Sequence, residues 1–166
     1  MSQVLDNILD HIQATLEKPP AGSLAAFSGY RSGMFVSLDK MSGGRLELEE
    51  LVGQSRVFEI DLANRETSLV RLGNAVPSSY NDTIPILVRY DGQGRHDKNA
   101  VLRKVTKDSL FLVDAIMRSS WSSITGCVSL NVEVAGIDRF ELADANSAAV
   151  FEGYILTLAV FASYDI

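Results

Sequence analysis

Hydrophobic and polar residues near the N-terminus alternate with the period of a helix. Apolar residues three or four positions apart form one stripe, which consists of Val4, Leu5, Ile8, Leu9, Ile12 and Leu16. Ser2 can cap this helix, and Pro19-Pro20 ends it because proline interrupts helical hydrogen bonding. A helix this short is not stable alone, so we expect its apolar stripe to dock on another element.

Alternation of apolar and polar residues predicts three strands in the first half of the chain, at residues 34–38, 56–62 and 84–90. Pro85 cannot donate a backbone hydrogen bond, which predicts an edge strand or a first strand position for it. Residues 46–51 are compatible with a short helix or an extended segment. Residues 21–33 and 63–82 are rich in small and turn-forming residues and are predicted to be long loops, the second with a short pairing piece at 69–72.

A second helix is predicted over residues 98–119, with Asp97 as its cap. Its apolar stripe consists of Val101, Leu102, Val105, Leu112, Val113, Ile116 and Met117. Residues 124–134 alternate strictly, which predicts a strand that Gly136 ends with a turn, followed by a short strand at 138–142 and a loop at 143–147.

The last predicted strand, residues 154–164, is apolar on both faces. Such a strand is covered on both faces in the folded state. Two helices can cover one face of the sheet, and the second cover comes from this chain or from a partner. The order of elements predicts an α+β fold, with a mainly antiparallel sheet, two helices packed on one face and extended loops.

Length and composition place this fold in one domain, residues 1–166. The chain has 166 residues, 46% of them hydrophobic and 22% charged. A net charge of −6 disfavours binding to duplex DNA. The single cysteine, the absence of a basic apolar leader and the lack of a long apolar run lead us to expect a soluble, intracellular protein with no membrane partner.

Candidate chemistry is sparse. His11 is expected to be a structural histidine, and Cys127 a small packed residue without a neighbouring base. Asp91, His96 and Asp97 could form a base or metal site, but a polar strand-to-helix connection explains them better. We therefore expect no catalytic, metal or cofactor site and assign no enzyme activity.

Interface residues are the better candidates. Four arginines lie in or beside the two connections that flank the strand at 84–90, and arginine is favoured at protein interfaces; they are Arg65, Arg71, Arg89 and Arg95. Trp121 is either corner packing or a subunit anchor. Ile155 and Phe161 lie on the second apolar face of the last strand, where a partner would bind.

The order of elements resembles the tail terminator (tail completion) proteins of long-tailed bacteriophages, the lambda-like minor tail protein U group. The resemblance rests on the N-terminal helix, the strand 86–90, a helix that carries Asp108 and Asp114 among apolar residues, and the apolar strand 154–164. It implies a hexameric ring that caps the tail tube at the head-proximal end of the virion tail, ends tube polymerisation and presents a surface to the head-tail connector or neck protein. It also implies assembly in the host cytoplasm and DNA passing through the lumen without specific binding.

Three other functions remain open at this point. Related phage proteins of similar fold act in the neck, at the head-tail connector or as tail tube subunits. A small α+β enzyme could use the loop at residues 91–97. An adaptor could bind another protein through this loop or through residues 63–82.

Overall fold

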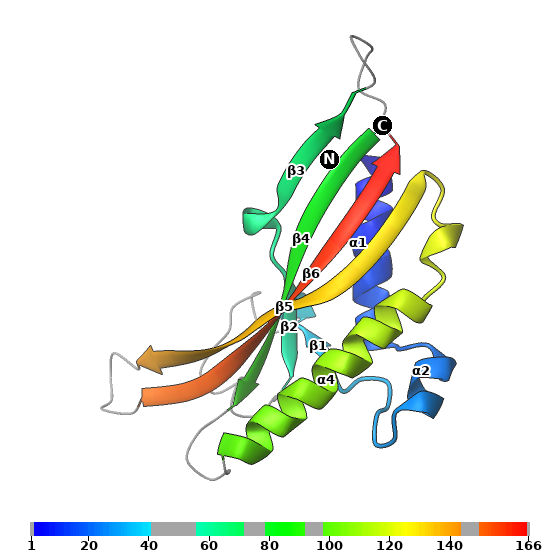
Figure 1. Ribbon diagram of the computed structural model, residues 1–166. Coiled ribbons are helices and arrows are strands. Elements are labelled where there is room, and N and C mark those ends of the chain that lie inside the picture. The colour runs from blue at the N-terminus through cyan, green and yellow to red at the C-terminus, as the bar shows by residue number, and fades with distance from the viewer. Residues whose placement is uncertain (1, 41–55, 72–78, 92–97, 144–149, 166) are drawn as a thin grey trace.

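The computed structural model describes residues 2–40, 56–71, 79–91, 98–143 and 150–165 (Figure 1). The predictions for residues 46–51, and those for Arg95, His96 and Asp97, lie outside these ranges. The helices are α1 (Gln3–Glu17), α2 (Ala21–Ala26) and α4 (Lys98–Arg118), with 3-10 turns η1 (Leu38–Lys40), η3 (Leu62–Asn64) and η4 (Trp121–Ser123). The strands are β1 (Val36–Ser37), β2 (Val57–Ile60), β3 (Glu66–Val70), β4 (Ser79–Asp91), β5 (Cys127–Ala143) and β6 (Val150–Asp165).

The six strands form one mostly antiparallel sheet, so the α+β prediction is confirmed. The strand order is β1-β2-β4-β6-β5, and β3 pairs with the upper half of β4 beyond the end of β2. Among the described strands, only the short β1–β2 pair is parallel. Figure 1 shows β4, β6 and β5 running side by side through the length of the molecule, with strong twist.

Helix α1 follows the sequence prediction closely. The Ser2 side chain accepts a hydrogen bond from the Leu5 amide at 3.2 Å, which caps the first turn. The buried stripe consists of Leu5, Ile8, Ile12 and Leu16. The stripe docks on the sheet and on α4, which supplies the tertiary packing that so short a helix needs.

The prediction of a loop throughout residues 21–33 is wrong at its start, where α2 forms. Tertiary contacts hold this six-residue helix. The Ser23 hydroxyl is buried and donates to Asp114 Oδ2 on α4 at 2.6 Å. Gly22 of α2 lies against the side chain of Arg118 on α4.

The predicted long loop at residues 63–82 is also wrong, except that the short pairing piece predicted at 69–72 overlaps the end of β3 at Leu69 and Val70. It contains η3, β3 and the first residues of β4, and residues 72–78 lie outside the described part. β3 is exposed at four of its five positions, and three of these are polar, so its sequence lacks the apolar alternation of a half-buried strand. Pairing with β4, from Glu66 opposite Thr83 to Val70 opposite Ser79, defines this strand.

Pro85 lies inside the central strand β4, not at an edge or at a first position. β2 pairs with β4 up to Ile86, and β3 resumes at Thr83, so Pro85 faces the gap between the two. Its carbonyl accepts the Asp61 amide at 2.8 Å on that side, where the chain leaves β2. The missing N–H therefore removes no bond to β6.

Gly136 does not end a strand, which corrects the predicted turn. β5 runs unbroken from Cys127 to Ala143 and pairs with β6 over its whole length. The register shifts between Val134 and Gly136, so a β-bulge absorbs an extra residue there. The predicted strands at 124–134 and 138–142 are two halves of one strand.

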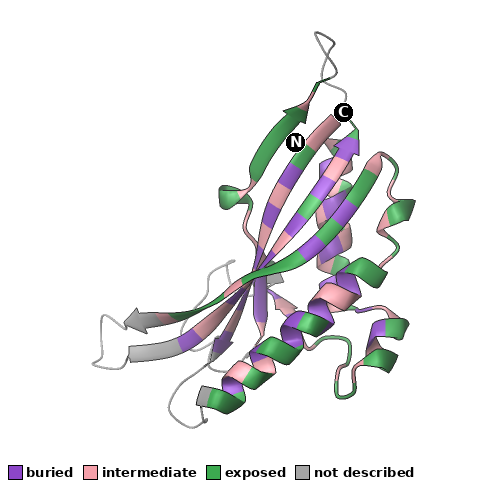
Figure 2. Ribbon diagram, in the orientation of Figure 1, coloured by how far each residue is buried: buried purple, intermediate pink, exposed green. Residues whose placement is uncertain are grey.

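The hydrophobic core lies between one face of the sheet and the helices α1 and α4, as predicted (Figure 2). Leu156, Leu158 and Val160 of β6 are fully buried on this face. The other face of β6 is less covered: Ile155 and Ala159 are half-buried, and Phe161 is 36% exposed. Coverage of both faces is therefore incomplete in the isolated chain.

Within the described ranges, each helix is too short or too polar to cross a membrane.

Candidate functional site

The open face of the sheet carries a shallow groove of about 420 Å³ across β3, β4, β6 and β5. Phe161 lies in this groove, paired with Thr83 on one side and Asn131 on the other. Paired residues of antiparallel strands point to the same face. The surrounding side chains are polar: Glu66, Ser68, Asn81, Ser129 and Ser163. An aromatic ring in a polar, hydrogen-bonding surround is typical of an interface anchor.

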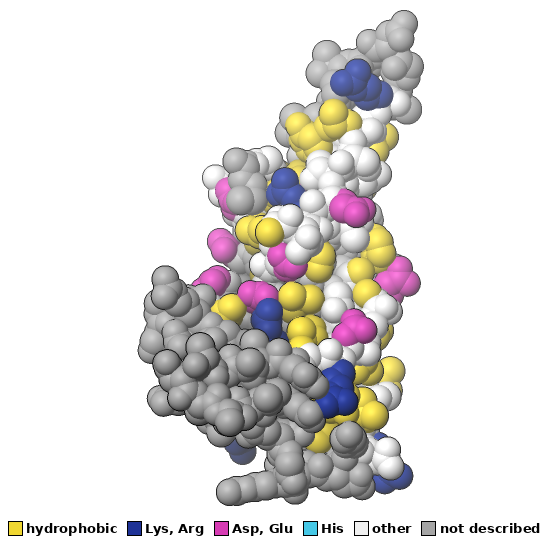
Figure 3. Space-filling model, turned by 90° about the vertical axis from the view of Figure 1, so that its left-hand side faces the viewer, with side chains coloured by type: hydrophobic (Ala, Val, Ile, Leu, Met, Phe, Trp, Pro, Cys, Tyr) yellow, Lys and Arg dark blue, Asp and Glu magenta, His cyan; other side chains and the backbone are white. Residues whose placement is uncertain are grey.

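Three exposed side chains on this open face are acidic. Glu66 and Glu133 are exposed, as is Asp138 further along β5. Figure 3 views the molecule from the side of β3 and η3, and acidic side chains lie there among hydrophobic and uncharged ones. The described residues of this face therefore do not form the positively charged surface that phosphate binding requires.

Arg89 and Ile155 are neighbours on the same open face, because they pair directly between β4 and β6. Arg89 Nη2 donates to Glu59 Oε1 of β2 at 2.6 Å, and its buried Nη1 has no hydrogen-bond partner among the described residues. Phe161 is six residues from Ile155, or ~20 Å at about 3.3 Å per residue. Three of the predicted interface residues thus share one face at two separate places.

Arg65 lies on the other side of β4, beside a buried carboxylate. Its Nε is 3.6 Å from Asp82 Oδ2, which also accepts the Tyr164 hydroxyl at 3.0 Å. Asp82 Oδ1 is buried and has no partner within the described part of the chain. Burial, and the negative charge of Asp82, raise the pKa of Tyr164 to about 12. This arrangement anchors the connection after η3 to the sheet.

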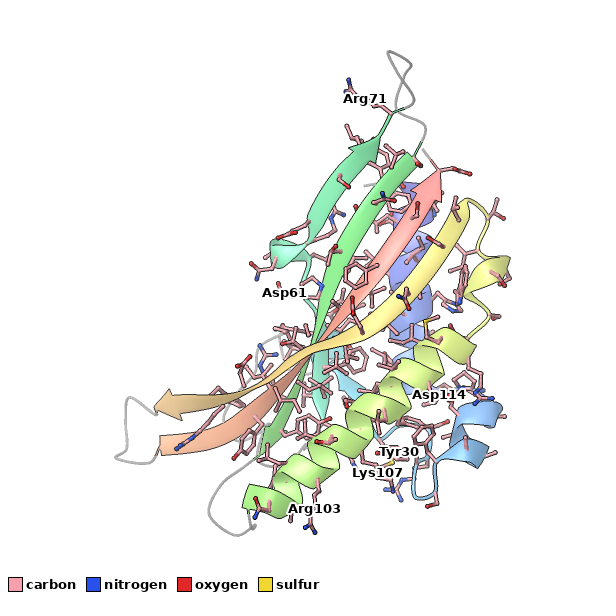
Figure 4. All side chains as sticks on the ribbon, in the orientation of Figure 1. Tyr30, Asp61, Arg71, Arg103, Lys107 and Asp114 are labelled. Carbon is pink, nitrogen blue, oxygen red and sulfur yellow. The ribbon has the colours of Figure 1, made fainter. Side chains whose placement is uncertain are left out.

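The remaining candidates do not join these groups. Arg71 is exposed just after β3, at the far tip of the molecule (Figure 4). Trp121 is half-buried in η4 and packs against the core at the corner between α4 and β5. Arg95 lies outside the described residues. An interface role for each of these residues stays a prediction.

Asp108 on α4 is a fully buried carboxylate, and no candidate list from the sequence included it as a site. It is fully buried and accepts the hydroxyls of Tyr30 at 2.6 Å and Tyr90 at 2.9 Å. Arg56 Nε donates to its Oδ2 at 2.8 Å, and Arg56 Nη2 to its Oδ1 at 3.1 Å. Desolvation and the neighbouring carboxylate raise the pKa of both tyrosines. The sequence signal that could have identified Asp108 is an acidic residue inside the apolar stripe of a predicted helix.

Arg56 has a strained backbone, which fits its place in this cluster. Its φ of 113° lies in the region that side chains other than glycine rarely adopt. Its carbonyl accepts the Val36 amide at 3.1 Å, so it also joins β1 to the start of β2. The cluster ties four segments of the chain together, which indicates a structural role.

One histidine–serine contact was missed by the sequence analysis. His11 Nε2 lies 2.9 Å from Ser119 Oγ, and this hydroxyl donates its proton to the Ile116 carbonyl at 2.6 Å. His11 therefore donates to the serine and is not placed to take its proton. Burial lowers the pKa of His11 and raises the pKa of the Cys127 thiol, which disfavours a thiolate.

In the ranges that the structure describes, histidine, cysteine and carboxylate side chains form no group of three or more that could hold an ion. Comparison of the chain with protein-family models gives no match, and comparison with curated proteins gives none either.

Proposed function

We propose that this chain is a structural virion protein that caps the tail tube of a long-tailed bacteriophage as a ring. In this role it ends tube polymerisation at the head-proximal end of the tail and forms the surface for head attachment. Its assembly takes place in the host cytoplasm, with the tail tube protein on one side and a head-tail connector or neck protein on the other. The support from the sequence is the resemblance in element order to tail terminator proteins.

The observation that carries the proposal is the uneven cover of the central strand β6. Helices bury one of its faces, while Phe161 on the other is 36% exposed in a groove of about 420 Å³. An aromatic residue of this exposure, ringed by hydrogen-bonding side chains, is suited to a protein contact. Sister copies in a ring, or the tube end, would supply that contact.

The charge of the molecule is compatible with a DNA-conducting ring. Phosphates are repelled by a net charge of −6, and the exposed charges on the open face include Glu66, Glu133 and Asp138. A ring with this net negative charge lets DNA pass without gripping it.

The alternative functions receive less support. A neck, connector or tube subunit would use the same open face, and the experiment below separates it from a terminator. The 92–97 part of the loop proposed for an enzyme lies outside the described residues. Deletion of residues 63–82 is not a clean test of an adaptor, because it removes β3 and shortens β4.

The direct test mixes the purified full-length protein with tail tube subunits from the same phage genome. Electron microscopy would measure tube lengths and inspect tube ends, and native mass spectrometry would give the mass of the oligomer. We expect rings at one end of the tubes and no growth beyond them. Unrestricted tube growth, or incorporation along the tube wall, would contradict a terminator.

A further inference from the structure

The outward surface of α4 has a basic and apolar patch, which we call the α4 patch. The described residues that line its hollow of about 600 Å³ are Asn99, Leu102, Arg103, Thr106, Lys107 and Leu110. Leu110 is 59% exposed, which is unusual for so large an apolar side chain. Arg103 is exposed and has no hydrogen bond or ion pair with any described residue. The patch therefore offers leucine side chains flanked by positive charge.

A second groove, of about 400 Å³, lies between α1 and the β2–η3 connection; we call it the α1 groove. Its described lining is Asp6, Leu9, Asp10, Gln13, Asp39, Ile60 and Leu62. Leu62 is 43% exposed, and Asp10 and Asp39 are exposed. No lysine or arginine occurs among these lining residues. The groove therefore pairs apolar side chains with negative charge.

The two surfaces are complementary and separate. Each combines exposed leucine with charges of one sign, and the signs are opposite. They share no residue, and Figure 4 shows Arg103 and Lys107 at the lower end of α4, well away from Asp61 beside η3. Contact between two different surfaces of identical chains is heterologous, and it produces a closed ring when the rotation between copies closes.

We infer that the α4 patch of one copy binds the α1 groove of the next copy. Leu102 and Leu110 meet the apolar walls of the groove, while Arg103 and Lys107 face Asp10 and Asp39. The ammonium of Lys107 donates to the Ser28 carbonyl at 3.2 Å and lies over the Tyr30 ring, and these two contacts hold the side chain at this surface. This inference rests on the proposed ring and names the surfaces that build it.

The test is a charge reversal in the full-length protein. Variant one carries Arg103→Glu and Lys107→Glu, and variant two carries Asp10→Lys and Asp39→Lys. Each variant makes its two surfaces alike in charge, so like charges meet across every contact. We expect self-association of each variant to be at least about tenfold weaker than wild type by analytical ultracentrifugation.

Mixing the two variants provides the matched control. In an equimolar mixture, each contact between unlike copies pairs opposite charges again, either in the native or in the reversed arrangement. Oligomers of alternating composition should therefore return, visible by native mass spectrometry as equal numbers of the two masses. Recovery also shows that both variants are folded.

The outcomes separate this inference from the proposed function. If wild type forms a ring and both variants form it equally well, the surfaces are wrong and the ring stands. If the variants are weakened but the mixture does not recover, the pairing of these two surfaces is wrong. If wild type stays monomeric even with tube subunits present, both the ring and this contact are overturned.

Discussion

At the scale of single residues, the carboxylate of Asp108 is fully removed from water. An isolated buried charge is very costly, and the cost is offset here by the Arg56 guanidinium and two tyrosine hydroxyls. Each partner comes from a different part of the chain. Loss of the carboxylate would leave the Arg56 side chain, which is 17% exposed, without its counter-charge.

We therefore predict that Asp108→Ala lowers the free energy of unfolding by about 3–5 kcal/mol, the range for breaking a buried ion pair. The matched control is Asp114→Ala on the same helix. Asp114 pairs with Arg118 in contact with solvent and also accepts the buried Ser23 hydroxyl, so its loss should cost about 1–2 kcal/mol, less than the loss of Asp108. Urea unfolding followed by circular dichroism measures both, and equal losses would contradict a central role for Asp108.

The pH dependence of stability tests the Tyr164–Asp82 contact. The pKa of Tyr164 is raised to about 12, above the value of about 10 in an unfolded chain. The folded state thus holds this proton more tightly, and the resulting stability is complete below pH 10 and is lost as pH rises towards 12.

We predict that Tyr164→Phe loses less free energy of unfolding than wild type between pH 10 and pH 12. Tyr30 and Tyr90 contribute the same pH dependence to both proteins, so the difference isolates Tyr164. Urea titrations at several pH values in this window provide the measurement. Parallel curves for the two proteins would show that the raised pKa is not linked to folding.

At the scale of elements, the close packing of the neighbouring strands β4, β6 and β5 depends on a glycine. Gly153 is buried between the Tyr90 carbonyl of β4 and the Phe140 ring of β5. A Cβ atom there would contact the Tyr90 carbonyl oxygen and would lie 2.6 and 2.7 Å from two carbons of the ring. Backbone on one side and a packed ring on the other leave little room for relaxation.

Gly153→Ala is therefore expected to lower the free energy of unfolding by about 1–3 kcal/mol, as overpacking does. Gly136→Ala on the neighbouring strand is the control, because the nearest atom to its Cβ, Asp138 Oδ2, is 3.9 Å away. That change should stay within about 0.5 kcal/mol. Thermal unfolding of the two variants compares them, and a neutral Gly153→Ala would show that the strands can separate locally.

For the whole molecule, the decisive feature is a sheet with helices on one face and a groove on the other. Phe161 and Leu69 are exposed to similar extents, 36% and 46%, but they lie on opposite faces of the sheet. Capping of the tube end is proposed to use the face of Phe161.

We predict that Phe161→Ser weakens capping of tube ends while Leu69→Ser leaves it unchanged. Both variants should remain folded, because each replaces a partly exposed side chain. Tube-length distributions by electron microscopy measure capping, and circular dichroism checks the fold. Equal capping by both variants would remove the open face from the contact.

Much of the architecture could be predicted from local patterns. The boundaries of α1 and α4, the core strand at 84–90 and the long apolar strand near the C-terminus all reflect burial on one side and water on the other. Such burial imposes a period of 3.6 or 2 residues on the sequence itself. The same patterns placed Ile155 and Phe161 on a less covered face, as the structure has them.

Other features were decided only by residues distant in the sequence. Pro85 is tolerated inside β4 because the gap between β2 and β3 faces it, and Gly136 continues β5 because β6 pairs on both sides of a bulge. β3 exists through its pairing with β4, and the buried position of Asp108 depends on Arg56 and two tyrosines. The sequence by itself determined which stretches bury one side, since that is a local periodic property. The tertiary structure decided which partners meet, because hydrogen bonds and ion pairs across the fold leave no period to read.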